Sequence, residues 1–215
     1  MSGLLIKDFN LMKSQYRFFV FVVGIAILMG FSTTEVFLYS YISVVIPLFT
    51  LNTISYDEFD NGNAFLFTLP ISRKAYVYEK YCFGLLLGVA SSLLSALLLA
   101  AFSLIKKTSM WELLTVLPFL FWVIVFMLAV MIPIQLKFGA DKGRIALFMV
   151  FGIAGVLGYG IVQLLKFYDI DVAAILEKFS ELGFGVLVAI AAAIMIVILL
   201  FSVRISVSVM NKKEF

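Results

Sequence analysis

Long apolar runs separated by short polar segments dominate the pattern of side chains along this chain. An α-helix needs about 20 mainly apolar residues to cross the hydrocarbon layer of a membrane, because it rises about 1.5 Å per residue. Six runs meet or approach that length, at residues 18–34, 36–55, 81–105, 113–135, 145–166 and 183–205. The pattern therefore predicts an all-α polytopic membrane protein with six transmembrane helices, in which residues 1–215 form a single transmembrane domain.

The first two runs are separated only by a short polar stretch that ends at Glu35. A single long helix through this point would bury the Glu35 carboxylate in hydrocarbon, where an ionised group is costly. We therefore expect two helices joined by a tight hairpin turn at the membrane surface. Within the second and fourth runs, Pro47, Pro118 and Pro133 remove backbone hydrogen bonds and permit kinks.

The cations predict how the helices are oriented, because positively charged loops stay in the cytoplasm. With the N-terminus inside, twelve of the 16 Lys and Arg residues fall in inner segments and four in outer segments. The inverted arrangement would place most cations outside. We therefore expect both the N- and C-termini in the cytoplasm, with residues 167–182 forming a modest outer segment.

The segment before the first run, residues 1–17, has an amphipathic pattern of its own. Its apolar side chains recur at helical spacing on one face: Leu5, Phe9, Met12 and Tyr16. Its polar side chains fall largely on the other face: Lys7, Asn10, Lys13, Ser14 and Arg17. This pattern is typical of a helix that lies along the headgroup layer. A frayed basic tail and a signal peptide are the alternatives, although no cleavage site of the A-x-A kind follows.

The amino-acid composition excludes several classes of protein function. Hydrophobic residues make up 64% of the chain and charged residues 13%, against roughly 45–50% apolar and about 25% charged residues in soluble domains. The chain has no His, the side chain used most often for metal ligation and acid-base catalysis. Cys82 is the single Cys, so no internal disulfide can form. The net charge of +3 is small and its cations are scattered, so nucleic acid is not an expected partner.

The apolar runs lack ionisable residues, and this absence bears on which energy source could drive transport. Apart from their ends they contain no Asp, Glu or Lys, and Arg204 lies near the end of the last run. Proton- and ion-coupled transporters usually place ionisable groups at mid-membrane, so the pattern argues against secondary transport. Neither an intramembrane protease set nor a G-x-x-x-x-G-K-[ST] phosphate loop is present. We therefore expect no catalytic or metal-binding residues, and any uphill transport must be driven by another polypeptide.

Small residues mark helix faces that allow close packing in lipid. The third run repeats them every four residues: Gly84, Gly88, Ser92 and Ala96. The fifth run carries a second set: Gly152, Gly155, Gly158 and Gly160. Such a face packs either against another helix of the same chain or against a second copy or sister subunit.

The longest inner loop, residues 56–80, has the pattern of a docking element. Its start is acidic and its body apolar, through Asp57, Glu58, Asp60, Ala64, Phe65, Leu66 and Leu69. Pro70 then ends the expected short helix. A basic turn and an aromatic and cationic belt lead into the third run: Arg73, Lys74, Tyr76, Tyr78, Lys80 and Tyr81. A short acidic and apolar helix just below the bilayer suits the binding of a soluble partner.

The order of residues in this loop resembles a known family. Glu58, Gly62, Leu69-Pro70, Arg73 and Lys80-Tyr81 are similar to the loop between the second and third helices of type-2 ABC exporter permeases. The likeness is to the small bacterial members, which include permeases of amphipathic-peptide toxin exporters. It covers about 25 residues in detail, and the rest of the chain through topology alone.

The resemblance implies roles for particular residues. The loop would be the coupling helix, which docks on a cytoplasmic ABC ATPase subunit through Asp57, Glu58, Asp60, Gly62, Phe65, Leu66, Leu69 and Pro70. Arg73 and Lys80 would anchor the chain at the lipid surface, where the charge pattern itself also predicts Lys7, Lys13, Arg17 and Lys74 as anchors. The ATPase would bind ATP and Mg²⁺, a second permease would complete the path, and the complex would lie in a bacterial plasma membrane. An ATPase-independent channel or membrane assembly protein is the alternative.

The cargo is predicted from the runs themselves. They are rich in Phe, and their main polar groups are hydroxyls and amides. A path of this kind suits an amphipathic peptide or a lipophilic compound better than sugars or inorganic ions, and the family resemblance favours a peptide. The alternative is that most of the 23 Phe side chains simply face lipid.

Overall fold

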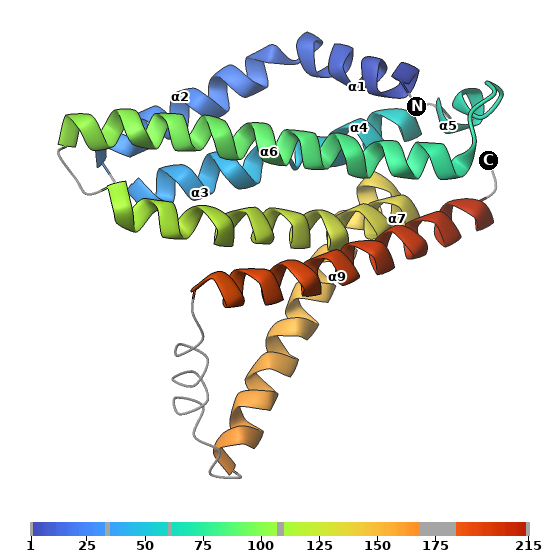
Figure 1. The fold of residues 1–215 in the computed structure, drawn as a ribbon. Coiled ribbons are helices and arrows are strands. Elements are labelled where there is room, and N and C mark those ends of the chain that lie inside the picture. The colour runs from blue at the N-terminus through green and yellow to red at the C-terminus, as the bar shows by residue number, and fades with distance from the viewer. Residues whose placement is uncertain (1, 33–34, 60–61, 107–109, 168–183, 214–215) are drawn as a thin grey trace.

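The computed structural model describes residues 2–32, 35–59, 62–106, 110–167 and 184–213. All secondary structure in these ranges is helical. Most helices run roughly side by side in a bundle, and the two chain ends lie together near the short helix α5 (Gly62–Leu66), at what we call the α5 end of the bundle (Figure 1). The all-α prediction is confirmed for the described residues.

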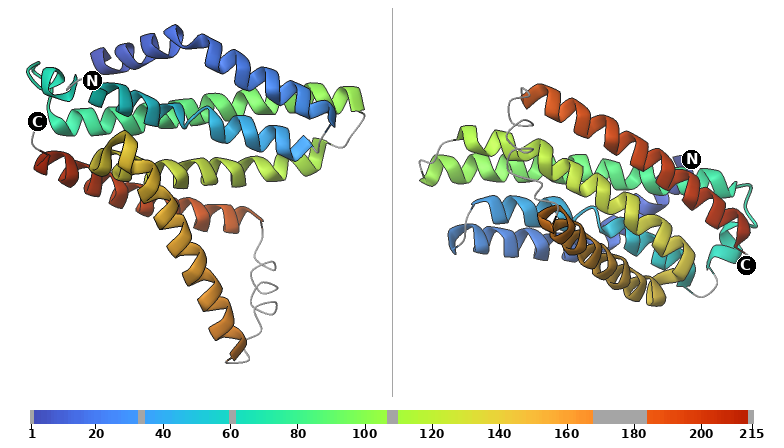
Figure 2. Two further views of the ribbon diagram at one scale, coloured as in Figure 1. Left: turned by 180° about the vertical axis from the view of Figure 1, so that it is seen from behind. Right: turned by 90° about the horizontal axis from the view of Figure 1, so that it is seen from below.

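The N-terminal segment forms two helices, α1 (Ser2–Ser14) and α2 (Tyr16–Ser32), whose axes differ by 62°. The next helix, α3 (Glu35–Val45), runs beside α2 in the opposite direction (Figures 1 and 2). The first two apolar runs are thus separate helices and not one long helix. The turn itself includes residues 33–34, which lie outside the described residues.

The second run is broken at its proline. Helix α3 ends at Val45, and α4 (Phe49–Glu58) begins after a turn around Pro47. Pro47 has no N–H for the carbonyl of Ser43, one helical turn earlier. The hydroxyl of Ser91 donates to that carbonyl instead, at 3.3 Å. The kink permitted by Pro47 is therefore present, and a side chain of a neighbouring helix replaces part of the missing hydrogen bonding.

Helix α6 (Arg73–Lys106) is the long central helix of the bundle. Ser72 caps its N-terminus, since the Ser72 hydroxyl accepts a hydrogen bond from the N–H of Ala75 at 3.1 Å. A side chain added at Gly84 or Gly88 would come within 3.1–3.2 Å of Leu128 or Ile124. These two glycines of the small-residue face therefore pack against another helix of the same chain.

Helix α7 (Met110–Phe167) contains the predicted fourth and fifth runs, divided at Gly139. Gly139 has φ 74°, a left-handed conformation that favours glycine. The first half of α7 lies against α6 and α9 (Phe184–Lys212), whereas the second half, residues 140–167, diverges from the bundle (Figures 1 and 2). The polar segment between the predicted fourth and fifth runs, residues 136–144, thus contains a sharp turn between two helices.

Among the described residues, three helical segments are long and apolar enough to cross a membrane: Arg73–Leu104, Leu120–Gly139 and Gly185–Lys212. The bent pair α1 and α2 would make a fourth if it counted as one span. The six-span topology and the cytoplasmic ends remain predictions. Most of the predicted outer segment, residues 167–182, lies outside the described residues.

Candidate functional site

A buried ionic cluster joins α1, α4 and α6 at the α5 end. At its centre the Lys80 ammonium lies 2.5 Å from an Asp8 carboxylate oxygen and 2.8 Å from one of Asp57. It also donates to the Thr53 hydroxyl at 3.0 Å. The side chains of Lys80 and Asp8 are fully buried, and Asp57 is nearly so. One lysine thus holds three helices together.

Two further side chains complete the contacts of the cluster with Asp57. Lys7 of α1 pairs with the Asp57 carboxylate and lies 3.2 Å from Asp8. The Tyr76 hydroxyl, fully buried on α6, donates to the second Asp57 oxygen at 3.1 Å. The end of α4 is therefore tied to both α1 and α6 through one carboxylate.

Glu79 lies at the edge of the cluster, and its carboxylate has weaker ionic and hydrogen-bonding contacts than those of Asp8 and Asp57. Its side chain is fully buried, and its nearest ionic partner is the Lys80 ammonium at 3.7 Å. Neither Glu79 oxygen accepts a hydrogen bond from the described part of the chain. We use the name ionic cluster for these six residues: Lys7, Asp8, Asp57, Tyr76, Glu79 and Lys80.

The cluster stabilises the charged form of its acid on α1. Burial raises the pKa of the Asp8 carboxyl, but the nearby ammonium groups of Lys80 and Lys7 outweigh burial, so the pKa lies below its ordinary value. Removing one member of a buried ion pair costs about 3–5 kcal/mol, because the other charge stays buried without a partner. The three helices are therefore expected to move together and not to separate at this point.

A second set of contacts ties the end of α4 to the opposite side of the bundle. The carboxylate of Glu58, adjacent to Asp57, lies 2.5 Å from the Lys213 ammonium, which also donates to the Leu136 carbonyl at 3.1 Å. A side chain added at Gly139 would lie 3.1 Å from a Glu58 oxygen, so the turn of α7 abuts this carboxylate. Asp57 and Glu58 thus connect α4 with α1, α6, α7 and the C-terminal segment.

Arg73 joins the start of α6 to the end of α9. Its guanidinium donates to the carbonyls of Met210, Asn211 and Lys213 at 2.9, 2.9 and 2.7 Å. The last carbonyls of a helix have no partner within the helix and carry partial negative charge, so a cation is favourable there. Arg73 therefore fixes the C-terminal segment beside the start of α6.

The described part of residues 56–80 exposes apolar side chains at the α5 end. Phe59 and Phe65 are each 72% exposed and Leu69 is 45% exposed. Leu66, by contrast, is buried in the core with Tyr76 and other apolar residues. Among the residues assigned to docking, Phe65 and Leu69 are thus accessible and Leu66 supports the fold. Asp60 lies outside the described residues.

Gly62 positions α5 directly against the end of α4. A side chain there would come 2.8 Å from the backbone carbonyl oxygen of Asp57. The close approach requires a residue with no side chain. Gly62 therefore allows α5 to pack directly against Asp57, a member of the ionic cluster.

The six residues expected at the lipid surface fall into two groups. Lys13, Arg17 and Lys74 are exposed. Lys80 is fully buried, Lys7 turns toward Asp57, and Arg73 binds the end of α9. The expected aromatic belt divides in the same way: Tyr78 is 49% exposed, whereas Tyr76 and Tyr81 are buried. Three of the expected anchors are therefore contacts within the protein.

Sequence reasoning missed Asp8 and Glu79 as members of the site. Asp8 lies between Leu4 and Met12 at helical spacing, on the face of α1 that packs inward. An acid on an apolar face was the available signal, because such a group needs a buried cation. Glu79 gives no comparable signal, since it lies beside Lys80 within residues 56–80, a part of the sequence with many charged residues.

The described residues contain no group of three or more His, Cys, Asp or Glu side chains arranged to hold a metal ion. Three helices among the described residues, or up to four if the bent pair α1 and α2 counts as one span, are long and apolar enough to cross a membrane, which indicates a polytopic membrane protein. The chain belongs to the ABC-2 family of transporter proteins, since the family model described as "ABC-2 family transporter protein" matches residues 3–211. No curated protein and no solved structure matches it.

Family membership defines the part that the chain plays. Membrane subunits of the ABC-2 family generally work with a cytoplasmic ATPase. The chain is accordingly the transmembrane part of an ABC transporter and a membrane protein. The expected resemblance to an ABC-2 type permease is confirmed at this level.

Proposed function

We propose that this chain is the permease subunit of an ATP-driven exporter, and that residues 56–80 form a coupling loop that binds the ATPase at the α5 end. The observation that carries the proposal is the exposed Phe65 on α5, the short helix that contacts the end of α4 where Gly62 approaches the Asp57 carbonyl. A large apolar side chain exposed outside the lipid suits a partner protein.

The contacts of α4 supply a route for the coupling. Motion of α5 would press on the end of α4 through the close contact at Gly62. Asp57 would pass this motion to α1 and α6, and Glu58 to α7 and the C-terminal segment. ATP-driven closure of two ATPase subunits would thus change the tilt of several helices at once. ATP and Mg²⁺ would be bound by those partners and not by this chain.

Co-purification tests the docking proposal. The chain, tagged and extracted in mild detergent from its host, should carry with it a cytoplasmic ATPase that is identified by mass. Phe65→Asp should remove most of the ATPase because it replaces an apolar contact by a charge that must be desolvated. Thr68→Asp is the matched control, since Thr68 is also exposed in the same loop and the variant adds the same charge.

Two results would contradict the proposal. Equal loss of the ATPase in both variants would show a general charge effect and not an apolar contact at Phe65. No bound ATPase in the unmodified protein would favour the alternative of an ATPase-independent channel or assembly protein.

We further propose six membrane spans, cytoplasmic ends and a core of two permease chains, either two copies or this chain with a related one. The support is the second half of α7, where a side chain added at Gly152, Gly155 or Gly158 would meet nothing within 4 Å among the described residues. A face of this kind can receive a second chain closely. Cross-linking in native membranes tests the stoichiometry, and a single permease chain per functional complex would contradict it.

The proposed cargo is an amphipathic peptide or a lipophilic compound, moved outward across a bacterial plasma membrane. The described membrane-length helices expose long apolar side chains, among them Leu93, Leu97, Ile196 and Leu200. Deleting the gene and comparing the peptides that are secreted and retained tests this assignment. Unchanged secretion, with unchanged sensitivity to membrane-active peptides, would remove the cargo and leave the docking proposal in place.

A further inference from the structure

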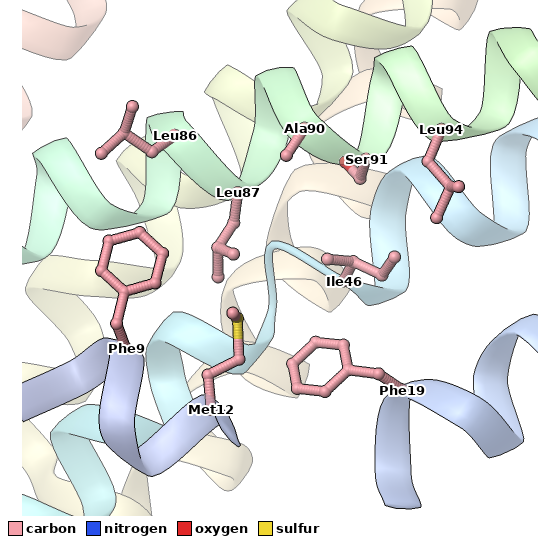
Figure 3. Close-up of a pocket in the computed structure, with 9 residues that line it drawn as sticks. All are labelled: Phe9, Met12, Phe19, Ile46, Leu86, Leu87, Ala90, Ser91 and Leu94. Atoms are coloured by element: carbon pink, nitrogen blue, oxygen red, sulfur yellow. The ribbon is translucent and has the colours of Figure 1, made fainter. Parts of the chain in front are cut away.

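An apolar pocket of about 380 Å³ lies between α1, α2 and α6, near the break after α3. Figure 3 shows Phe9, Met12 and Phe19 facing Leu87 and neighbouring side chains of α6 across the space. Its volume falls in the range of roughly 300–1,000 Å³ that is usual for small-ligand sites. The bend of 62° between α1 and α2 contributes to this space by carrying the two helices in different directions.

The apolar lining of the pocket favours a ligand that is a hydrocarbon chain. Ser91 is its one polar side chain, and the Ser91 hydroxyl already bonds the carbonyls of Gly88 at 3.0 Å and Ser43 at 3.3 Å. A peptide in the pocket would bring backbone N–H and C=O groups that need partners, and leaving them unpaired costs several kcal/mol. A saturated chain needs none. The pocket therefore fits an acyl chain.

Two exposed cations, Lys13 and Arg17, lie on the two helices that form one wall of the pocket, near the bend between α1 and α2. Lys13 follows Phe9 by one helical turn on α1, and Arg17 lies two residues before Phe19 on α2. Both side chains are exposed, and neither pairs with a carboxylate in the described ranges. A cation with no acidic partner at the headgroup layer attracts the phosphate of an anionic lipid.

From the lining and these cations we infer that the pocket is a binding site for an anionic phospholipid. One acyl chain fills the space between Phe9, Phe19 and Leu87, and the phosphate binds Lys13 and Arg17. The site follows from the membrane location of the chain and is independent of ATPase docking. Because Phe9 shares α1 with Lys7 and Asp8, a bound lipid would also hold the helix that carries two members of the ionic cluster.

A photoactivatable acyl chain tests the inference directly. The full chain is reconstituted in phosphatidylcholine vesicles that contain a trace of phosphatidylglycerol with the reactive group on its acyl chain, and the labelled peptides are identified. Labelling is expected in residues 86–94 and 9–19. The same reactive chain on phosphatidylcholine should label less, on the order of tenfold, as expected for two cations at a membrane surface.

Matched variants separate this site from general lipid contact. Ala90→Trp fills the pocket and should remove the labelling, whereas Leu93→Trp adds the same ring to an exposed position that does not line the pocket and should preserve it. Lys13→Gln with Arg17→Gln should abolish the preference for phosphatidylglycerol, and Lys142→Gln, which removes an exposed cation elsewhere, should not.

Three outcomes would overturn the inference. Equal labelling in the two Trp variants would place the acyl chain outside the pocket. Equal labelling by both headgroups in the unmodified chain would remove the role of the cations. If an added amphipathic peptide that carries the same reactive group labels the pocket residues and lowers the labelling by lipid, the pocket would be a cargo site and not a lipid site. ATPase co-purification, measured in the same samples, reports separately on the proposed function.

Discussion

The α5 end of the bundle and the second half of α7 are built in opposite ways. At the α5 end, buried ion pairs and hydrogen bonds connect α1, α4, α6 and the C-terminal segment. In the second half of α7 the described side chains are largely exposed, as Phe148 at 81% and Val156 at 73% illustrate. The first region is specified by contacts within the chain, whereas the described side chains of the second have few such contacts.

This difference predicts different roles for the two regions in a transporter: one transmits motion, and the other changes position or binds a partner. A region tied by several buried ion pairs transmits motion as a unit, because breaking any one of them is costly. A helix with few contacts inside its own chain can change position at low cost, or be held by a partner. We therefore expect coupling to depend on the α5 end and subunit contacts to depend on the second half of α7.

The largest expected effect comes from removing the central cation of the ionic cluster. Lys80→Met leaves the Asp8 and Asp57 carboxylates buried beside an apolar side chain and should lower the free energy of unfolding by about 3–5 kcal/mol. The midpoint of thermal unfolding in detergent measures it. Lys142→Met, at an exposed position, should change the midpoint little. Wild-type stability in Lys80→Met would contradict the role of the cluster.

The next effect distinguishes two neighbouring residues of α5. Leu66→Ala should cost about 2–5 kcal/mol, because Leu66 is 8% exposed and packs in the core. Phe65→Ala should change stability by no more than about 0.5 kcal/mol, because Phe65 is 72% exposed. Bound ATPase should show the reverse order, once the loss of folded Leu66→Ala protein is corrected. If Phe65→Ala retains the ATPase fully, the exposed ring is not the contact.

Two glycines should respond with opposite signs. Gly62→Ala should destabilise by about 1–3 kcal/mol, since its new methyl group would meet the Asp57 carbonyl at 2.8 Å. Gly152→Ala should stabilise the isolated chain by about 0.5–1 kcal/mol, because a helical glycine is replaced where nothing lies within 4 Å in the described structure. Thermal unfolding of both variants checks the comparison, and equal effects would contradict it.

Much of the helical arrangement was predictable from the sequence. The apolar runs gave the helices, Pro47 marked the break between α3 and α4, and Glu35 marked the start of a new helix. These features depend on local chemistry, either apolar length or a missing N–H. The assignment of residues 56–80 as a coupling loop, from the acidic start and Pro70, stays a prediction.

The ionic cluster was not predictable in this way. Lys80 follows the pattern of an interface cation, next to tyrosines and at the start of an apolar run, and the family resemblance likewise implied that it is a lipid anchor. Its actual partners, Asp8 and Asp57, are distant in sequence and come from other helices. Periodicity reports which face of a helix is buried, but it does not report which charges meet there.

The smallest expected effect tests how the C-terminal segment contributes to the rigid α5 end. Glu58 and Lys213 are 16% and 27% exposed, so their pair is partly screened and should contribute about 1 kcal/mol or less. Glu58→Lys should therefore lower the unfolding midpoint slightly, because it also places two cations together. Glu58→Lys combined with Lys213→Glu should restore only part of the loss, since a Glu at 213 cannot donate to the Leu136 carbonyl as Lys213 does. Lys212→Glu is the matched control at the adjacent exposed position. The same midpoint for the single and the exchanged double variant would show that the pair adds nothing, and ATPase co-purification in both variants would then show whether Glu58 acts in docking alone.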